Sequence, residues 1–195
     1  MDRPTGEFQA RTISVRTHSQ SIARLLEVLM LLALGVVAIA LHARFKSPLS
    51  IPGHHGLEFM ALLMLGRLSS NMKYASSLSS LGMGVFLLFP FVGFSDPMMG
   101  YNYMLPGFML DLSYRWLGSS RFKLLLLAIF AGFSYMLVPL SRLLVNLTTG
   151  YQYGAFLKHG FVLPFVSWFF FGLAGGLLGT GISKTLTRFL SKLSK

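Results

Sequence analysis

Apolar residues along the chain gather into six long stretches, which are separated by short segments of charged and turn-forming residues. The hydrocarbon core of a bilayer is about 30 Å thick and needs about 20 helical residues to cross it. The pattern therefore predicts an all-α fold, a polytopic membrane protein built as a bundle of six transmembrane helices. The expected spans are 25–43, 53–68, 74–92, 97–117, 122–147 and 155–186.

These spans predict three parts of the chain: a cytoplasmic N-terminal tail at 1–24, a membrane domain at 25–189 and a basic cytoplasmic tail at 190–195. The sixth span is long enough to extend beyond the bilayer or to bend at Pro164. One alternative stays open for the first span. Its small residues at 37–40 are spaced as in a signal-peptide cleavage site, although the preceding tail contains acidic residues that a short basic leader lacks. Removal of that segment would leave five helices.

Small residues at four-residue spacing predict close packing between these helices, because they let two backbones approach each other. Such residues occur in the third and sixth spans: Ser76, Ser80 and Gly84, Gly172 with Gly176, and Gly175 with Gly179.

Composition agrees with a membrane protein. Of the 195 residues, 53% are hydrophobic and 12% are charged, whereas an ordinary soluble domain has about 25% charged residues. The same lack of polarity excludes a disordered chain. The absence of cysteine excludes disulfides, thiolate metal sites and cysteine nucleophiles.

The net charge of +11 is distributed unevenly over the two sides of the expected bundle. Thirteen of the 17 basic residues fall in the N-terminal tail, the second and fourth connections and the C-terminal end. The positive-inside rule therefore predicts that both termini are cytoplasmic, in a multi-pass protein of the cell membrane. The charge indicates orientation and contact with anionic membrane lipid, and no nucleic-acid partner is expected.

Charged residues inside the spans require a partner or a purpose, because a charge near the bilayer centre costs about 2.5 to 3.5 kcal/mol. Glu58 and Arg142 both lie at the depth of the outer leaflet and could face each other. They form either a stabilising ion pair or the polar floor of a pocket open to the outside. Asp111 and Arg115 are four residues apart and are expected to pair on one helix face near the cytoplasmic end.

The outer ends of the spans are rich in groups that suit a small molecule, because aromatic faces stack on flat rings while amides and imidazoles orient polar edges. An interfacial aromatic belt is the alternative for any single tyrosine. Asp96, Gln152 and Lys158 lie in the same segments. The predicted binding residues are Glu58, Arg142, His54, His55, Tyr101, Asn102, Tyr103, Asn146, Tyr151, Tyr153 and His159.

No metal, cofactor or catalytic site is predicted. Adjacent helical residues such as His54 and His55 point about 100° apart and form a poor chelate. The segment 176–184 fails as a phosphate loop, because Ile182 stands where a lysine should follow Gly181. No hydrolase or metalloprotease motif occurs, so the chain is not expected to be an enzyme.

The six-helix layout, the segment Tyr-Met-Leu-Pro-Gly-Phe-Met-Leu-Asp at 103–111 and the glycine-rich ending at 171–184 resemble a known family. The chain resembles the substrate-binding membrane subunit, or S component, of energy-coupling factor transporters, which import vitamins and related micronutrients in prokaryotes. The resemblance extends from the first span to Phe189. It implies that a small molecule binds from the outside and that the subunit then reorients on docking to a transmembrane coupling subunit driven by two cytoplasmic ATPases. The subunit itself would carry no ATPase site.

The resemblance also implies a docking surface on the first span, where the family often has an Ala-x-x-x-Ala pattern. Here Val37 stands four residues after Ala33, in place of the second alanine of the pattern. The small residues Gly35, Ala38 and Ala40 are therefore the candidate contacts. The segments 52–55, 94–103 and 148–159 would cover the pocket. The metal-binding N-terminus of the cobalt and nickel members does not occur in this sequence.

Two other classes stay open. An integral membrane enzyme acting on a lipid or isoprenoid would need acidic or histidine clusters on one side. A non-catalytic assembly subunit of a membrane complex would need no polar cluster at the outer ends.

Overall fold

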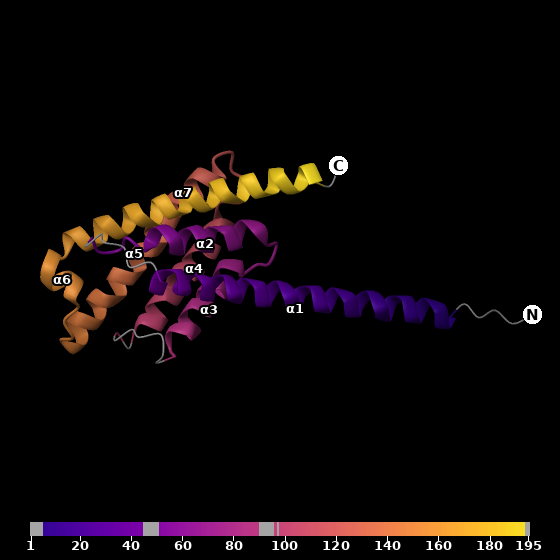
Figure 1. Cartoon of the computed structure of the whole chain (residues 1–195), viewed down its shortest axis with the longest axis horizontal. Helices are drawn as coiled ribbons and strands as arrows, with labels where there is room; N and C mark the ends of the chain where they lie inside the picture. The colour runs from indigo at the N-terminus through magenta and orange to yellow at the C-terminus, as the bar shows by residue number, and fades with distance from the viewer. Residues whose placement is uncertain (1–5, 45–50, 90–95, 97, 194–195) are drawn as a thin grey trace, which may run out of the picture.

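The described residues form seven helices, which Figure 1 labels. The computed structural model describes residues 6–44, 51–89, 96 and 98–193, with the side chains of the first helix described from residue 20 onward. No strand occurs within these ranges, which confirms the all-α prediction. The helices are α1 (Gly6–Arg44), α2 (Gly56–Ser69), α3 (Ala75–Leu87), α4 (Met99–Trp116), α5 (Lys123–Thr149), α6 (Gly154–His159) and α7 (Val162–Leu193).

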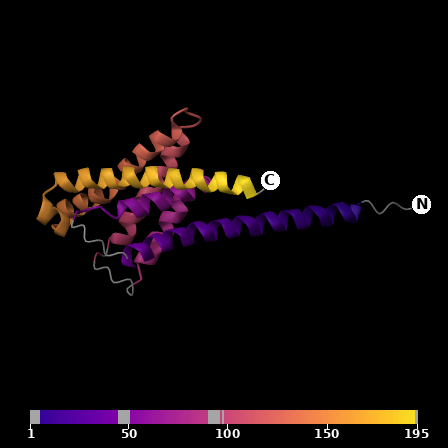
Figure 2. The same ribbon diagram turned by 45° about the horizontal axis from the view of Figure 1, so that its top comes forward.

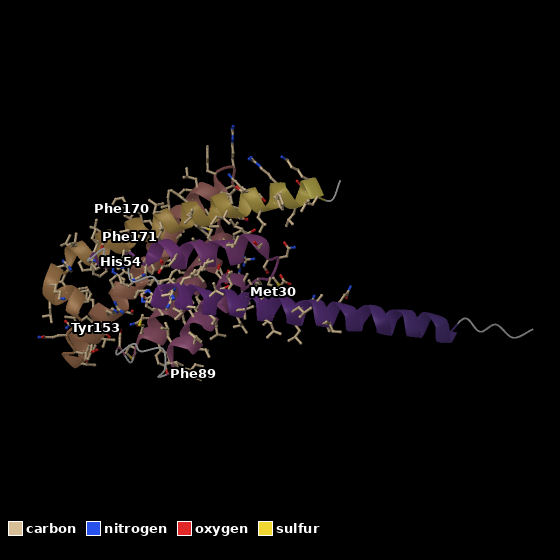
Figure 3. All side chains as sticks on the ribbon, in the orientation of Figure 1. Met30, His54, Phe89, Tyr153, Phe170 and Phe171 are labelled. Atoms are coloured by element: carbon tan, nitrogen blue, oxygen red, sulfur yellow. The ribbon has the colours of Figure 1, made fainter. Side chains whose placement is uncertain are left out.

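Three helical segments of the described chain are long and apolar enough to cross a membrane: Gln20–Arg44, Lys123–Thr149 and Val162–Leu193. The exposed surface carries large apolar side chains that a soluble protein would bury. Met30 is 73% exposed and Phe170 60% exposed, and Figure 3 shows both on the outside of the bundle. These features support a membrane protein. The helices at the second and third predicted spans have only 14 and 13 residues, so the count of six spans stays a prediction.

The structure changes the limits of two predicted elements. Residues 6–24 continue the first span as part of the single helix α1, so no break separates the expected tail from the membrane domain. The sixth predicted span is interrupted at Gly160, which has φ 67° and ψ −169°. Only glycine adopts this conformation readily, so α6 ends there. Pro164 instead lies in the first turn of α7, where a proline needs no hydrogen-bond partner for its nitrogen.

Six of the helices form a closed ring in which each helix contacts the next, in the order α1, α3, α4, α5, α7, α2 and back to α1. The short helix α2 contacts each of the other five helices of this ring. Its Phe59, Met60, Leu63 and Met64 are almost completely buried for that reason. The first described turns of α1 and the last turns of α7 lie toward the same end of the molecule in both Figure 1 and Figure 2.

Close approach between helices depends on small residues, as predicted for Gly175 and Gly179 in the sixth span and as found also for Gly35 in α1. A Cβ added at Gly35 would overlap the backbone of α3 at Ser79, and one added at Gly179 would overlap the backbone of α2 at Ala61. Gly35 and Ala38 are therefore buried inside the bundle and do not form a surface for a coupling subunit in this conformation. Of the three predicted docking residues, only Ala40 is exposed.

A buried charge network joins α2, α3 and α4 near the end of the bundle where α1 and α7 extend. The Asp111 carboxylate accepts a hydrogen bond from Arg67 Nη1 at 2.8 Å, and it also accepts from the amides of Ser76 at 3.1 Å and Ser77 at 2.7 Å. The predicted Asp111–Arg115 pair is wrong, because Asp111 points inward to donors on α2 and α3 while Arg115 is exposed. These bonds hold the first turn of α3, whose amides lack intrahelical partners.

Candidate functional site

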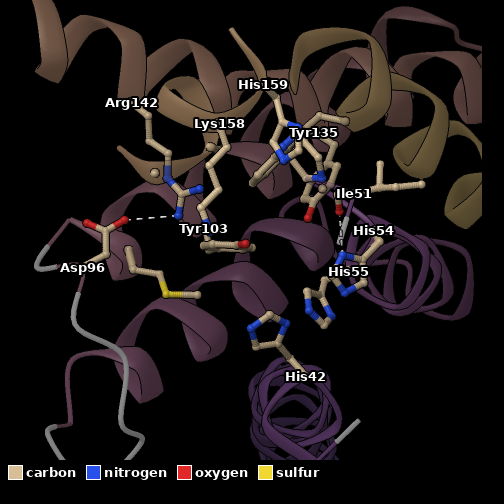
Figure 4. Close-up of a pocket in the computed structure, with 16 residues that line it drawn as sticks. His42, Ile51, His54, His55, Asp96, Tyr103, Tyr135, Arg142, Lys158 and His159 are labelled. Atoms are coloured by element: carbon tan, nitrogen blue, oxygen red, sulfur yellow. Dashed lines mark hydrogen bonds and ion pairs between the residues drawn. The ribbon is translucent and has the colours of Figure 1, made fainter. Parts of the chain in front are cut away.

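A cavity of about 460 Å³ opens among the ends of α1, α4, α5 and α7, the segment 51–55 and the short helix α6. Its volume lies in the range of small-molecule sites. The cavity lies at the end of the bundle away from the last turns of α7, where Figure 3 labels His54 and Tyr153. Figure 4 shows two polar groups of side chains in it, Arg142 with Asp96 on one side and three histidines on the other.

Arg142 is held in place by a carboxylate and two aromatic rings. Its Nη2 donates to Asp96 Oδ2 at 3.1 Å, and its guanidinium lies 5.4 Å from the Tyr153 ring centroid and 5.5 Å from that of Trp168. Asp96 precedes α4, and its other oxygen accepts from the amide of Met98. Charge-assisted bonding and cation–π contact both restrict the orientation of an arginine, so the cavity presents a preorganised cation.

The wall next to Arg142 is aromatic. Tyr135 and Trp168 stack with ring centroids 4.5 Å apart, and Tyr103 lies 6.4 Å from Trp168. All three line the cavity. Tyr153 lies outside this wall. Burial raises the pKa of its phenol, which therefore stays neutral and able to donate a hydrogen bond. The arrangement suits a ligand with a flat part beside a negatively charged group.

Two N–H groups in the cavity wall have no hydrogen-bond acceptor within the described residues. Arg142 Nε and Trp168 Nε1 are buried and form no hydrogen bond within the described part of the chain. Lys158 also lines the cavity and has no carboxylate within ion-pair distance among the described residues. Buried donors in native proteins are normally satisfied by protein groups, ordered water or ligand, so these groups can bond to acceptor atoms that enter the cavity.

The opposite wall holds His42 and His55, with Glu58 behind them, and we call these three potential metal ligands the histidine–glutamate cluster. His42 lies in the last turn of α1, His55 precedes α2, and Glu58 is in the first turn of α2. His55 Nδ1 donates to Glu58 Oε1 at 2.7 Å, and His42 Nδ1 lies 3.8 Å from the same oxygen. One ligand atom from each residue lies within 4.8 Å of the others.

The cavity contains five of the predicted binding residues: His54, His55, Tyr103, Arg142 and His159. The structure places the remaining six elsewhere. Glu58 contacts His42 and His55 behind the cavity wall, Tyr153 lies against Arg142, and Asn102 is buried between helices. Asn146 donates to the Tyr151 carbonyl at 2.7 Å and so closes the end of α5. Tyr101 and Tyr151 are exposed and lie outside the cavity.

Glu58 and Arg142 do not pair with each other within the described structure. Arg142 pairs with Asp96 and Glu58 with the two histidines. The fold brings Asp96, which precedes α4, to Arg142, and it brings His42, in the last turn of α1, to Glu58. Residues 94, 95 and 97 of the expected covering segment 94–103 lie outside the described residues.

Three residues of the cavity or cluster were not singled out from the sequence: His42, Tyr135 and Trp168. Asp96 and Lys158 were placed in the polar outer segments but not among the predicted binding residues. His42 could have been found from the sequence, because it is a histidine at the end of the first expected span. That end lies on the same side of the expected membrane as His54 and His55 at the start of the second span. Tyr135 and Trp168 sit within apolar spans and carry no local signal that separates them from ordinary core residues.

Comparison with known proteins finds no matching family model, no matching curated protein and no matching solved structure.

Proposed function

We propose that this chain is a membrane-embedded binding subunit that captures a small molecule in the cavity and hands it to a transport partner, as the resemblance to S components implies. The observation that carries the proposal is a cavity at one end of the helix bundle that holds an ordered arginine and two unsatisfied donors. A bundle that served only as an assembly subunit would have no reason to bury these groups, because each unpaired donor costs about 1 to 3 kcal/mol.

The cavity favours a ligand with an anionic group and a flat part. Arg142 and Lys158 offer positive charge, and Asp96 accepts from only one nitrogen of the Arg142 guanidinium, Nη2, in the described structure. The stacked Tyr135–Trp168 pair offers a rigid aromatic surface next to it. A carboxylate-bearing heterocycle fits both features.

The partner follows from the resemblance. The subunit would bind from the face that carries the cavity and then deliver its ligand by docking on a transmembrane coupling subunit with two cytoplasmic ATPases. Ala40, the exposed member of the predicted docking set, lies on α1 near the cavity end and is the residue of that set available for contact.

One observation favours the membrane-enzyme alternative. The histidine–glutamate cluster provides the histidine and acidic groups on one side that such an enzyme would need. A subunit of a transporter should copurify with a coupling subunit and two ATPases, whereas an enzyme should not.

The ligand test is native mass spectrometry of the purified full chain after incubation with a metabolite extract. We expect a retained small molecule on the wild type, its loss in Arg142→Gln, and unchanged retention in Arg121→Gln, which alters an exposed arginine in the connection before α5. Equal retention by both variants would remove Arg142 from the binding site. Absence of any retained molecule together with failure to recover the coupling subunit and the ATPases would contradict the proposal.

A further inference from the structure

The histidine–glutamate cluster has the composition and spacing of a transition-metal site. Two imidazole nitrogens and a carboxylate oxygen converge from the end of α1 and the start of α2. An ion held tetrahedrally at about 2.0–2.2 Å from each ligand requires ligand atoms about 3.3–3.6 Å apart. The observed separations of 2.7 Å and 3.8 Å from Glu58 Oε1 lie on either side of this range, so small side-chain rotations suffice.

The cluster is shielded but not sealed. The side chains of His42, His55 and Glu58 are 11%, 19% and 25% exposed. The two imidazole rings lie close together, with centroids 3.7 Å apart. Two imidazolium ions at this separation would repel each other, whereas two neutral imidazoles can share one ion, and the Glu58 carboxylate offsets part of its charge.

A third histidine, His54, lies next to the cluster. His54 Nδ1 bonds to the Ile51 carbonyl at 2.8 Å, and because a carbonyl only accepts, this nitrogen carries the proton. The neutral ring then has its lone pair on Nε2, which is buried and has no hydrogen-bond partner within the described residues. Metal-binding histidines are oriented by this kind of bond to a backbone carbonyl. The His54 ring lies 3.8 Å from the His55 ring.

We propose that His42, His55 and Glu58 bind one divalent transition metal ion, such as Zn²⁺ or Co²⁺, in the wall of the cavity. Two histidines and a carboxylate are a ligand set that these ions take, and three protein ligands leave a position open. His42 and His55 line the cavity, so the open position faces the space that the small molecule would occupy. Binding of the ion through His55 Nδ1 moves the proton that this nitrogen shares with Glu58 to Nε2 of the same ring by exchange through solvent, so the imidazole stays neutral and no net proton is released.

Metal binding by the cluster is independent of transport. If the chain binds the ion but no coupling subunit copurifies with it, the metal site is supported and the transport function is contradicted. If the coupling subunit and its ATPases copurify but no ion binds, the transport function is supported and the metal site is contradicted. The two proposals therefore fail separately.

The test uses the full chain purified through a tag without histidines and stripped with EDTA. Titration with Co²⁺ is expected to produce ligand-field absorption bands that saturate at one ion per chain. We expect the affinity of His42→Ala, His55→Ala and Glu58→Gln to fall by about 100-fold or more, because even the loss of an outer partner of a metal ligand costs about 10- to 100-fold. His18→Ala is the matched control, since His18 lies in the distant N-terminal part of α1; its Co²⁺ affinity should equal that of the wild type.

A second measurement decides the matter if the variants fold poorly. Electron paramagnetic resonance of the wild-type chain with one equivalent of Cu²⁺ should show hyperfine coupling to imidazole nitrogens. Saturable Co²⁺ bands with nitrogen coupling support the site. An absence of saturable Co²⁺ binding, a Cu²⁺ spectrum without nitrogen coupling, or an affinity that all three cluster variants leave unchanged would each overturn it.

Discussion

Removing the Arg67 guanidinium should destabilise the bundle strongly, because it leaves the Asp111 carboxylate buried without its cation. Both side chains are about 3% exposed. Arg67 also donates to the carbonyls of Ser70 at 2.9 Å and Met72 at 2.6 Å, in the connection between α2 and α3. Loss of one partner of a buried ion pair costs about 3 to 5 kcal/mol. We expect Arg67→Met to lower the free energy of unfolding by about this amount.

Asp111→Asn should cost a similar amount for the reciprocal reason, since Arg67 then loses its only carboxylate partner in the described structure. The double variant Arg67→Met with Asp111→Asn should be less destabilised than the sum of the two single variants, because it leaves no unpaired charge. The difference between the sum and the double variant measures the coupling between the two residues. We expect it to exceed about 1 kcal/mol.

The assay is unfolding of the detergent-solubilised chain by SDS, followed by tryptophan fluorescence. Trp168 is a suitable reporter because it is 3% exposed and stacks on Tyr135. Arg115→Met is the matched control: Arg115 is exposed and is the arginine that helical spacing alone would pair with Asp111. It should leave the free energy of unfolding nearly unchanged. A loss below about 1 kcal/mol for Arg67→Met, or strict additivity in the double variant, would refute the reasoning.

Two further predictions concern packing and orientation. Gly35→Leu should lower the thermal midpoint of the detergent-solubilised chain, because the new side chain meets the α3 backbone at Ser79. Overpacking of this kind costs about 1 to 3 kcal/mol. Gly181→Leu is the control and should leave the thermal midpoint unchanged, because a Cβ at Gly181 meets nothing within 4 Å. An equal shift in both variants would contradict the role of Gly35. Because the chain has no cysteine, Gln152→Cys and Ser119→Cys place single thiols on either side of α5. A membrane-impermeant maleimide should label the Gln152 variant in intact cells and the Ser119 variant only after lysis. The reverse pattern would contradict cytoplasmic termini, and labelling of both in intact cells would contradict a transmembrane α5.

The helices were predictable from the sequence because lipid and hydrogen bonding act on each segment separately. A long apolar segment in a bilayer satisfies its backbone internally and therefore forms a helix wherever it lies. The interruption at Gly160 was not predicted, since glycine is tolerated inside transmembrane helices and its positive φ depends on how α6 and α7 pack. The cavity end was predictable as a region from its tyrosines, histidines and amides, but five of the eleven predicted residues line the cavity.

The sequence by itself determined the helical content, the membrane character and the end of the molecule where polar chemistry collects, because these follow from local composition and periodicity. Only the tertiary structure decided the partners of the charged residues: Asp111 with Arg67, Arg142 with Asp96, and Glu58 with His42 and His55. A charge inside an apolar bundle pairs with whichever opposite charge or donor the helix packing brings within reach. The distance between two charged side chains on different helices depends on how those helices pack. It cannot be predicted from residue spacing along one helix.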